Sequence, residues 1–538
     1  LRIKGGTYGA TAEVDFSGVT QLILDGPVSI DFSAATVAAG FTKGAFFYWG
    51  GGALTALPAL AEDVVEGGYQ LTFESAPSLS DGDFIVLYNP TDGSWHGSRT
   101  VYRAGEWAKV ESVAGEDVTL CWGSDASYAA ADIDLYRHPM ARIEVVGGLL
   151  TIIESTHANL KALAGIKLKL LADSDFSRFR TAGLSGHTAI MTSMCVDCTG
   201  KGMKARHRRD VSLGTNYGLS VANCDSCHFE GAFHGNRHGA TFSGTDEVGC
   251  VPSRRTLLEG TFSRPMNNNG SLGAFSCHAN VEKSEVRGRF IGGGITISGD
   301  KVKYSGTVET PGLGIYGGEM VGLDHDLSGV RIKSFGPNPS GRGIIDLGGN
   351  GNAFDAYTTR GGVLNLRNVE VDAPQTSIMA RIRNRGYAGG QPIIVDMRGA
   401  RFKDAVASAP SITLTAVSGD EIALVLLDGF DNAATGAWAI HATTKVRGWR
   451  AAGTASVAGN TDGSVAQQAV TYPQPAPRAE PVITFDPKDA IGGTRALDLQ
   501  AGGRSAAGFT INATKRDGAA YASATAGTVG WSAVVDEY

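Results

Sequence analysis

The sequence predicts an all-β protein built mainly as a parallel β-helix, a solenoid in which each coil of the chain stacks on the coil before it. Short strand-like segments recur at intervals of about thirty residues, which marks a repeat architecture. Glycine accounts for 74 of the 538 residues, about twice its ordinary share, so turns are frequent and long helices have little room. A solenoid also suits a chain of this length, because each coil contacts only its neighbours.

The repeat is clearest where segments align residue by residue. Residues 255–262 resemble residues 283–290, which gives an offset of 28 (290 − 262) along the chain. Downstream, Leu366, Met397 and Leu427 occupy equivalent positions in three further segments, with offsets of 31 (397 − 366) and 30 (427 − 397). Each unit is a short alternating strand that ends at a residue tolerant of positive φ, and none has the 3.6-residue apolar period of a helical repeat. A strand-only repeat of this length is typical of a parallel β-helix.

The chain divides into five predicted parts. Residues 1–37 contain two strand-and-turn units, which we interpret as the first coils of the helix. Between 38 and 140 the repeat is interrupted by a segment rich in Trp and Tyr, which predicts a β-rich insertion packed on the helix. The repeat returns and continues through 141–455, the main β-helix. Residues 456–478, rich in small residues and Pro, predict a linker, and the alternating residues 479–538 predict a small C-terminal β domain.

Composition limits the partners and the compartment. The net charge of −7 argues against nucleic acid as the main ligand, since phosphate binding requires a basic surface. No run of eighteen apolar residues predicts a membrane span, so we expect no membrane insertion. The first residues do not form a secretory signal, and five of the seven cysteines lie between Cys195 and Cys250. Free thiols in a protein assembled in the cytoplasm are therefore expected.

Six short segments are characteristic: 5–8 (GGTY), 82–85 (GDFI), 102–106 (YRAGE), 236–240 (NRHGA), 277–282 (CHANVE) and 527–533 (GTVGWSA). They resemble segments of bacteriophage tailspikes, the pectate-lyase-like β-helix proteins that depolymerise bacterial surface polysaccharide. The resemblance implies a right-handed β-helix, a homotrimer, other phage tail proteins as partners, and a place on the virion from which the protein acts outside the host cell. It also implies a preceding particle-binding domain. The polysaccharide would be an O-antigen, a capsule or an exopolysaccharide.

Two CxxC pairs, Cys195 with Cys198 and Cys224 with Cys227, have two possible interpretations. Four thiolates in tetrahedral geometry could bind zinc. The offset of 29 between the pairs (224 − 195) equals one coil, however, which favours cysteines stacked as an inward ladder. We therefore predict no metal and no cofactor. The need for calcium stays open, although no acidic cluster is spaced like a calcium loop.

The basic run KARHRRD at 204–210 is a candidate sugar-binding segment. Arg206 and His207 could bind an anionic sugar, because a guanidinium binds a carboxylate through two hydrogen bonds. The alternative is a solvated turn between two coils.

Histidines and arginine cluster in the centre of the chain. His238 follows Arg237, and His278 comes later at an offset of 40 (278 − 238), about one long coil. If the intervening loop with Asp246 and Glu247 bulges outward, these groups line one groove with Glu282. The alternative is a set of surface histidines in turns. We predict Arg237, His238, His278 and Glu282 as catalytic residues, and as substrate-binding residues Arg206, His207, His234, Asn236, Asp246, Glu247, Asn280 and Tyr316.

Two reaction types fit these residues. In a lyase, an arginine neutralises a uronate carboxylate, a histidine abstracts the adjacent proton, and a tyrosine or second histidine protonates the leaving oxygen. In a glycoside hydrolase, two of Asp246, Glu247, Glu282 and Glu319 would act as acid and base about 6.5–9.5 Å apart. The lyase is favoured because basic and imidazole groups dominate the central segment. A glycan-binding adhesin without catalysis is the third possibility.

Overall fold

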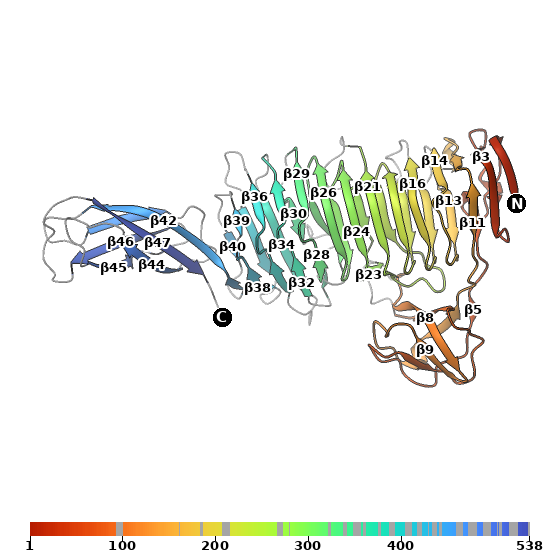
Figure 1. The fold of residues 1–538 in the computed structure, drawn as a ribbon, viewed down its shortest axis with the longest axis horizontal. Helices are drawn as coiled ribbons and strands as arrows, with labels where there is room; N and C mark the ends of the chain where they lie inside the picture. The colour runs from red at the N-terminus through yellow and green to blue at the C-terminus, as the bar shows by residue number, and fades with distance from the viewer. Residues whose placement is uncertain are drawn as a thin grey trace.

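The computed structural model confirms the predicted fold class, a right-handed parallel β-helix with a β-rich insertion near the N-terminus and a small C-terminal β domain (Figure 1). Two long parallel sheets run the length of the helix, with 19 and 14 strands in the described part of the chain. The structure describes residues 1–92, 101–160, 162–182, 187–206, 216–265, 273–278, 280–320, 324–336, 342–347, 357–358, 362–374, 378–386, 393–403, 411–416, 422–428, 430–432, 438–440, 444–458, 466–471, 481–487, 497–502, 504, 508–515 and 526–535.

The first sheet lies along one side of the helix. Its strands are β1 (Arg2–Gly9), β3 (Gln21–Asp31), β11 (Glu144–Gly147), β12 (Leu150–Ile153), β14 (Phe179–Ala182), β16 (Thr199–Arg206), β18 (His228–His234), β21 (Leu257–Ser263), β24 (Glu285–Ile291), β26 (Lys303–Thr310), β28 (His325–Asp326), β29 (Arg331–Ser334), β32 (Gly362–Asn365), β33 (Glu370–Asp372), β35 (Ile393–Asp396), β36 (Arg401–Lys403), β38 (Ile422–Leu426), β39 (Asp431–Asn432) and β41 (Lys445–Arg447).

The second sheet is formed by strands that come, along the chain, between strands of the first sheet. They are β2 (Val14–Asp15), β4 (Ala45–Gly50), β13 (Ala164–Lys169), β15 (Thr188–Ser193), β17 (Tyr217–Ala222), β19 (His238–Ser243), β22 (Phe275–Cys277), β25 (Ile295–Gly299), β27 (Ile315–Met320), β30 (Ile345–Leu347), β31 (Tyr357–Thr358), β34 (Ile378–Gly386), β37 (Ser411–Ala416) and β40 (Trp438–Ile440). Three 3-10 turns lie at Ala38–Gly40, Ala130–Asp132 and Ala158–Leu160. No helix in the described ranges has the length and apolar character needed to cross a bilayer.

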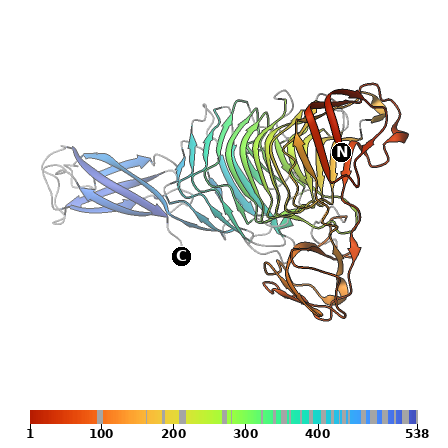
Figure 2. The same ribbon diagram turned by 45° about the vertical axis from the view of Figure 1, so that its right-hand side comes forward.

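Figure 2 shows the stacked coils of the helix. Inside it, the inward side chains of successive coils form ladders. Phe233, Phe262 and Phe290 pair across β18, β21 and β24, with ring centroids 5.9 and 5.3 Å apart and rings 16° and 21° from parallel. The sequence offset between Phe262 and Phe290 is therefore confirmed as one coil. Each such ladder buries apolar area that a single coil could not bury alone.

A column of paired glycines, Gly231, Gly260, Gly288 and Gly306, crosses the same three strands and β26. Gly260 and Gly288 have φ values of +133° and +153°, a region that favours glycine. A Cβ on either residue would lie 1.9 Å from the carbonyl oxygen of the glycine one coil earlier, Gly231 or Gly260. The close approach of these backbones lets the ladders on both sides of the column stay in register.

The four CxxC thiols lie inside the helix. All four cysteines are at most 2% exposed, belong to the main hydrophobic core and are free. Their sulfurs donate to backbone carbonyls, for example Cys198 Sγ to Val196 O at 3.3 Å and Cys227 Sγ to Asp225 O at 3.2 Å. This is the inward ladder that the one-coil offset between the pairs favours. Among the described residues, no group of His, Cys, Asp and Glu side chains is arranged to hold a metal ion.

The insertion is a six-stranded sheet that hangs from the helix near its N-terminal end (Figure 1). The helix extends further than the expected boundary at residue 38, because β4 pairs with β13 in the second sheet up to Gly50. The strands of the insertion are β5 (Thr55–Ala56), β6 (Gln70–Thr72), β7 (Phe84–Tyr88), β8 (Gly105–Ala114), β9 (Asp117–Leu120) and β10 (Asp134–Arg137).

The C-terminal domain continues from the end of the helix, at the left of Figure 1. Val446 of β41, in the last coil, belongs to the same hydrophobic core as Trp449, Phe509 and Trp531, so this domain packs directly on the last coil. Strands occupy part of the segment expected as a linker. The two antiparallel sheets contain β42 (Trp449–Ala458), β44 (Val482–Pro487) and β47 (Ala526–Val535), and β43 (Ala466–Thr471), β45 (Leu497–Gly502) and β46 (Gly508–Lys515).

Candidate functional site

The candidate site lies where two coils begin their strands in the second sheet. Leu219 and Val221 of β17 belong to the core, whereas Tyr217, the first residue of the strand, does not. Tyr217 pairs with His238, the first residue of β19. The parallel register therefore stacks an aromatic phenol directly over an imidazole.

Four rings and one guanidinium meet at this point. The rings of Tyr217 and His238 stack with centroids 5.5 Å apart and planes 11° from parallel. His278 meets both rings edge-on, with centroids 6.1 Å from Tyr217 and 6.3 Å from His238. His187 lies 5.6 Å from Tyr217, and the Arg237 guanidinium lies 5.9 Å from the centre of the same ring. We call Tyr217, Arg237, His238 and His278 the imidazole cluster.

The hydrogen bond of His238 fixes its tautomer. Its Nδ1 lies 2.6 Å from the carbonyl oxygen of Gly273. A carbonyl can only accept, so Nδ1 carries the proton and Nε2 keeps its lone pair. Burial is the main cause that lowers the pKa of His238 well below its usual range, and the neighbouring cations Arg237 and Arg264 add to the effect. At neutral pH the ring is therefore neutral, and the side chain is 3% exposed.

Arg206 and His234 lie at the neighbouring corner of the helix. Arg206 ends β16 and pairs with His234 at the end of β18, three residues before Arg237. His234 Nδ1 lies 3.0 Å from the hydroxyl of Ser263. Burial lowers the pKa of His234, and the charge of Arg206 lowers it further. Asn236 is buried in the turn between His234 and the cluster, and His207 lies outside the described residues.

Glu282 does not join the imidazole cluster, contrary to the expected groove. It lies in β23 (Val281–Glu282), which pairs with β20 (Ser253–Arg254) under the insertion. Its carboxylate, 1% exposed, accepts hydrogen bonds of 2.9 and 2.7 Å from Arg254. His278 and Glu282 are separated by a corner of the coil, so residues four apart in sequence face different elements.

The same buried contact joins the insertion to the helix. Arg254 donates to the carbonyl of Gly105 at 2.7 Å and lies 3.2 Å from Asp125 and 3.8 Å from Glu106. Burial raises the pKa of Glu106, an effect that Arg254 opposes. We call Glu106, Asp125, Arg254 and Glu282 the interdomain ion cluster. Its residues hold two domains together rather than face a groove.

Asp246 and Glu247 also lie apart from the imidazole cluster, whereas the backbone N–H of Asn280 donates to the carbonyl of His278 at 2.7 Å. Asn280 is fully buried against Gly244, beside Tyr102 of the insertion, where a Cβ on Gly244 would lie 2.3 Å from Asn280 Nδ2. Glu247 forms a 2.7 Å ion pair with Lys169 of β13, and Asp246 is exposed. The loop after β19 therefore folds back toward earlier coils.

Tyr316 lies further along the second sheet. The register Thr241, Ser276, Thr296, Tyr316 places it three coils after β19, about 14 Å from Thr241. The Arg342 guanidinium lies 5.1 Å from the Tyr316 ring. On the next strand, β30, Tyr316 pairs with Asp346. Asp346 accepts a 2.7 Å hydrogen bond from Arg381, and burial raises its pKa. The sequence did not identify Arg342, Asp346 or Arg381, because no segment around them aligns with another at a readable offset.

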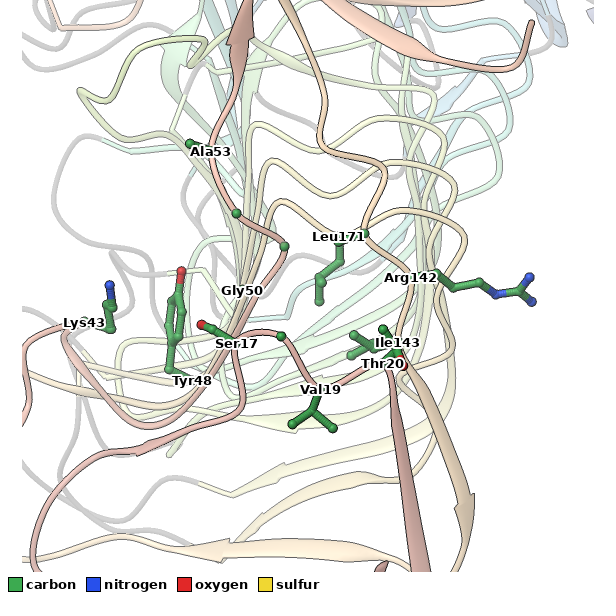
Figure 3. A pocket seen from close by; sticks show the side chains of 14 residues that line it. Ser17, Val19, Thr20, Lys43, Tyr48, Gly50, Ala53, Arg142, Ile143 and Leu171 are labelled. Atoms are coloured by element: carbon green, nitrogen blue, oxygen red, sulfur yellow. The ribbon is translucent and has the colours of Figure 1, made fainter. Parts of the chain in front are cut away.

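A pocket of about 560 Å³ opens at the other end of the second sheet, where the insertion leaves the helix (Figure 3). Lys43, Tyr48 and Ser17 lie on one side of it and Leu171 on the other. Burial, with nearby carboxylates, raises the pKa of Tyr48 to about 12, so its hydroxyl stays protonated. Tyr48 pairs with Asp15 of β2 and with Lys167, in the register that leads to Ser220, one coil before Thr241.

Two segments of the chain match models of protein families. Residues 50–138, the insertion, match the tailspike protein-like Ig-like domain. Residues 186–346 match the Gp49 pectin lyase-like family, and these coils carry the imidazole cluster. No curated protein matches the sequence.

Solved structures share the whole fold. The tailspike gp61 of Pseudomonas phage phi297 has a TM-score of 0.83 and 21% identity, covering 99% of this chain and 89% of that chain. The tailspike protein gp49 of Pseudomonas phage LKA1 has a TM-score of 0.80 and 22% identity, covering 100% and 90%. The Gp54 tailspike of Acinetobacter baumannii bacteriophage AP22 has a TM-score of 0.74 and 14% identity, covering 100% and 91%. These similarities agree with the resemblance carried by the short sequence segments.

Proposed function

We propose that this chain, a tailspike of the pectin lyase-like β-helix kind by its fold and its two family matches, binds a bacterial surface polysaccharide and depolymerises it. The observation that carries the proposal is the imidazole cluster, in which a cation, a phenol and a neutral imidazole base lie in mutual contact. The Acinetobacter relative was solved with capsular saccharide, which supports a polysaccharide ligand.

The proposed reaction is β-elimination at a uronic acid. Arg237 would bind the uronate carboxylate and stabilise the negative charge that develops on it. His238 Nε2 would remove the proton from the carbon next to that carboxylate. The electron pair left behind forms a carbon–carbon double bond as the glycosidic oxygen leaves, and that oxygen takes a proton from Tyr217 or His278. No water is consumed.

A glycoside hydrolase is the second candidate. Asp346 favours it, because its raised pKa is the property that a general acid needs and it lies beside Tyr316. Its ion pair with Arg381 would have to open before it could donate a proton. The lyase is preferred because the imidazole cluster already brings a cation, a phenol and a neutral imidazole together.

The oligomeric state and the place on the virion are proposed from the same likeness to tailspikes. We propose that the protein is a homotrimer on the virion tail, attached through other phage tail proteins, assembled in the bacterial cytoplasm and active outside the cell. Light scattering of the purified protein tests the trimer, since a monomer or dimer in solution would contradict it.

The deciding experiment is a digest of purified surface polysaccharide from a susceptible host. Ultraviolet absorbance and mass spectrometry of the fragments are followed together. New absorbance from an unsaturated uronate, with no added water, is the result expected of a lyase. Fragments heavier by one water, without new absorbance, would establish a hydrolase and shift the assignment to Asp346. Binding without fragments would establish an adhesin.

A further inference from the structure

A pocket of about 290 Å³ lies on the first sheet, on the strands that follow the coils of the imidazole cluster. Its floor is formed by β26, β29, β33 and β36. Figure 1 labels β26, β29 and β36. The inward residues Val308, Ile332 and Val371 belong to the core. The walls are therefore the outward side chains of these strands, and they are charged.

Most of the negative charge in this pocket is already paired. Glu309 accepts hydrogen bonds of 2.8 and 3.0 Å from Arg289, and Glu370 lies 3.6 Å from Arg331. Lys333 and Lys403 are exposed, and neither forms an ion pair within the described part of the chain. Of the pocket carboxylates only Asp372 is left beside these two ammonium groups, so the pocket favours an anion.

An exposed aromatic ring lies next to Lys333. Phe335 is 45% exposed, and its backbone N–H donates to the carbonyl of Thr310 at 2.9 Å, which places it directly after β29, beside the end of β26. The Lys333 ammonium lies 5.5 Å from the centre of the ring. A flat apolar ring bordered by hydrogen-bonding groups suits the two kinds of surface on a sugar, its C–H face and its hydroxyl rim.

The register sets the spacing of the two cations. Lys333, Asp372 and Lys403 are successive partners on β29, β33 and β36. The Cα atoms of the two lysines are therefore two strand spacings apart, about 9.5 Å. Such a pair can contact two negatively charged groups along one extended chain.

We propose that Phe335, Lys333 and Lys403 form a second, non-catalytic site for an acidic saccharide segment. The inference rests on the proposed function, since the ligand is another part of the same uronate-containing polymer. Binding at the first sheet would raise the local concentration of polymer at the imidazole cluster on the second sheet. The site would thus increase retention of long polymer without touching the bond that is cleaved.

The test measures binding of host polysaccharide, native or carboxyl-reduced, to a cleavage-deficient His238→Ala protein. Adding Lys333→Ala with Lys403→Ala, or Phe335→Ala, should weaken binding of native polymer about five- to tenfold. The lysine pair should make no difference with carboxyl-reduced polymer. Lys445→Ala, an exposed lysine of β41 in the same sheet, is the matched control and should bind as the parent does.

Each outcome separates the inference from the proposed function. Unchanged affinity in both sets of variants would overturn the second site and leave the depolymerase proposal intact. If the His238→Ala parent binds neither polymer while its melting temperature matches the unmodified protein, polysaccharide recognition itself fails and the second site fails with it.

Discussion

His238 differs from an ordinary surface histidine because both of its ring nitrogens have a defined state. Nδ1–H is held by the Gly273 carbonyl, and Tyr217 stacks on the ring face. The orientation of Nε2 is therefore set before any ligand arrives. A base that is oriented and neutral in advance loses little free energy to reorganisation during proton transfer.

Removal of either central imidazole tests this assignment. His238→Ala and His278→Ala should each reduce the rate of cleavage by about 10²- to 10⁴-fold, because a general acid or base is lost. The rate of product formation is the measurement. His228→Ala is the control, since His228 lies on the first sheet beside Glu259, and it should keep its rate. Full activity in both cluster variants would refute the site.

Arg237 should act mainly in the transition state. Its charge is needed most when the carboxylate takes up the electrons of the departing proton, so Arg237→Ala should lower kcat about 10²-fold and raise KM less. Arg237→Lys keeps the charge but loses the two-point geometry, and we expect an intermediate rate. A change in KM alone, measured with defined oligosaccharides, would assign Arg237 to binding only.

His138 should make the fold sensitive to acid. Its Nδ1 accepts the Met140 N–H at 3.0 Å and its Nε2 donates to Met194 O at 3.1 Å, so protonation breaks a hydrogen bond in a buried site. Burial lowers its pKa to about 4. A pKa lowered in the folded state means that stability is complete above the unfolded value, about 6.5, and is lost as the pH falls toward 4.

This loss amounts to about 2.5 kcal/mol of unfolding free energy at pH 4.5. His138→Gln keeps both hydrogen bonds but cannot be protonated. The free energy of unfolding is measured with urea at pH 7 and at pH 4.5. Between these two pH values it should decrease less in the variant than in the unmodified protein, by about that amount. Equal decreases in the two proteins would contradict the role of His138.

At the scale of single elements, the glycine column sets how closely the strands of the first sheet approach. Gly260→Ala adds a Cβ at a φ of +133° and 1.9 Å from a backbone oxygen, which no side-chain movement relieves. We expect a loss of at least about 3 kcal/mol or failure to fold. Thermal unfolding and soluble yield measure it. Gly9→Ala, where a Cβ meets nothing within 4 Å, should be neutral.

The interdomain ion cluster determines how firmly the insertion is attached. Arg254→Met would leave the carboxylates of Glu106 and Glu282, each 1% exposed, without their cation. Loss of one partner of such a buried group costs about 3–5 kcal/mol. We expect earlier unfolding in urea and faster proteolysis of the insertion. Arg2→Met removes an exposed pair with Asp25 and should change stability by less than about 1 kcal/mol. Similar stabilities of the two variants would contradict this role.

At the scale of the whole molecule, the sequence predicted the helix because its ladders repeat within the local sequence. Phe262 and Phe290 follow from an offset that can be read directly, and so do the stacked cysteines. The site was predicted only in part. His238 and His278 meet, since both lie on strands of the second sheet or directly after one, whereas Glu282 lies past a corner that residue spacing alone does not reveal. Tyr217 can be recognised as part of the site only when the strand register, which pairs it with His238, is known.

Side chains point alternately into the core and toward the surface along each strand, so substitutions at inward and outward positions have different effects. A change at Leu219 or Val221 disturbs neighbouring coils, whereas a change at Arg237 or Lys333 alters the surface and leaves the ladders in place. Outward residues can therefore be exchanged on an unchanged frame. The same property makes the scaffold suitable for redesign of its outward surface, one coil at a time.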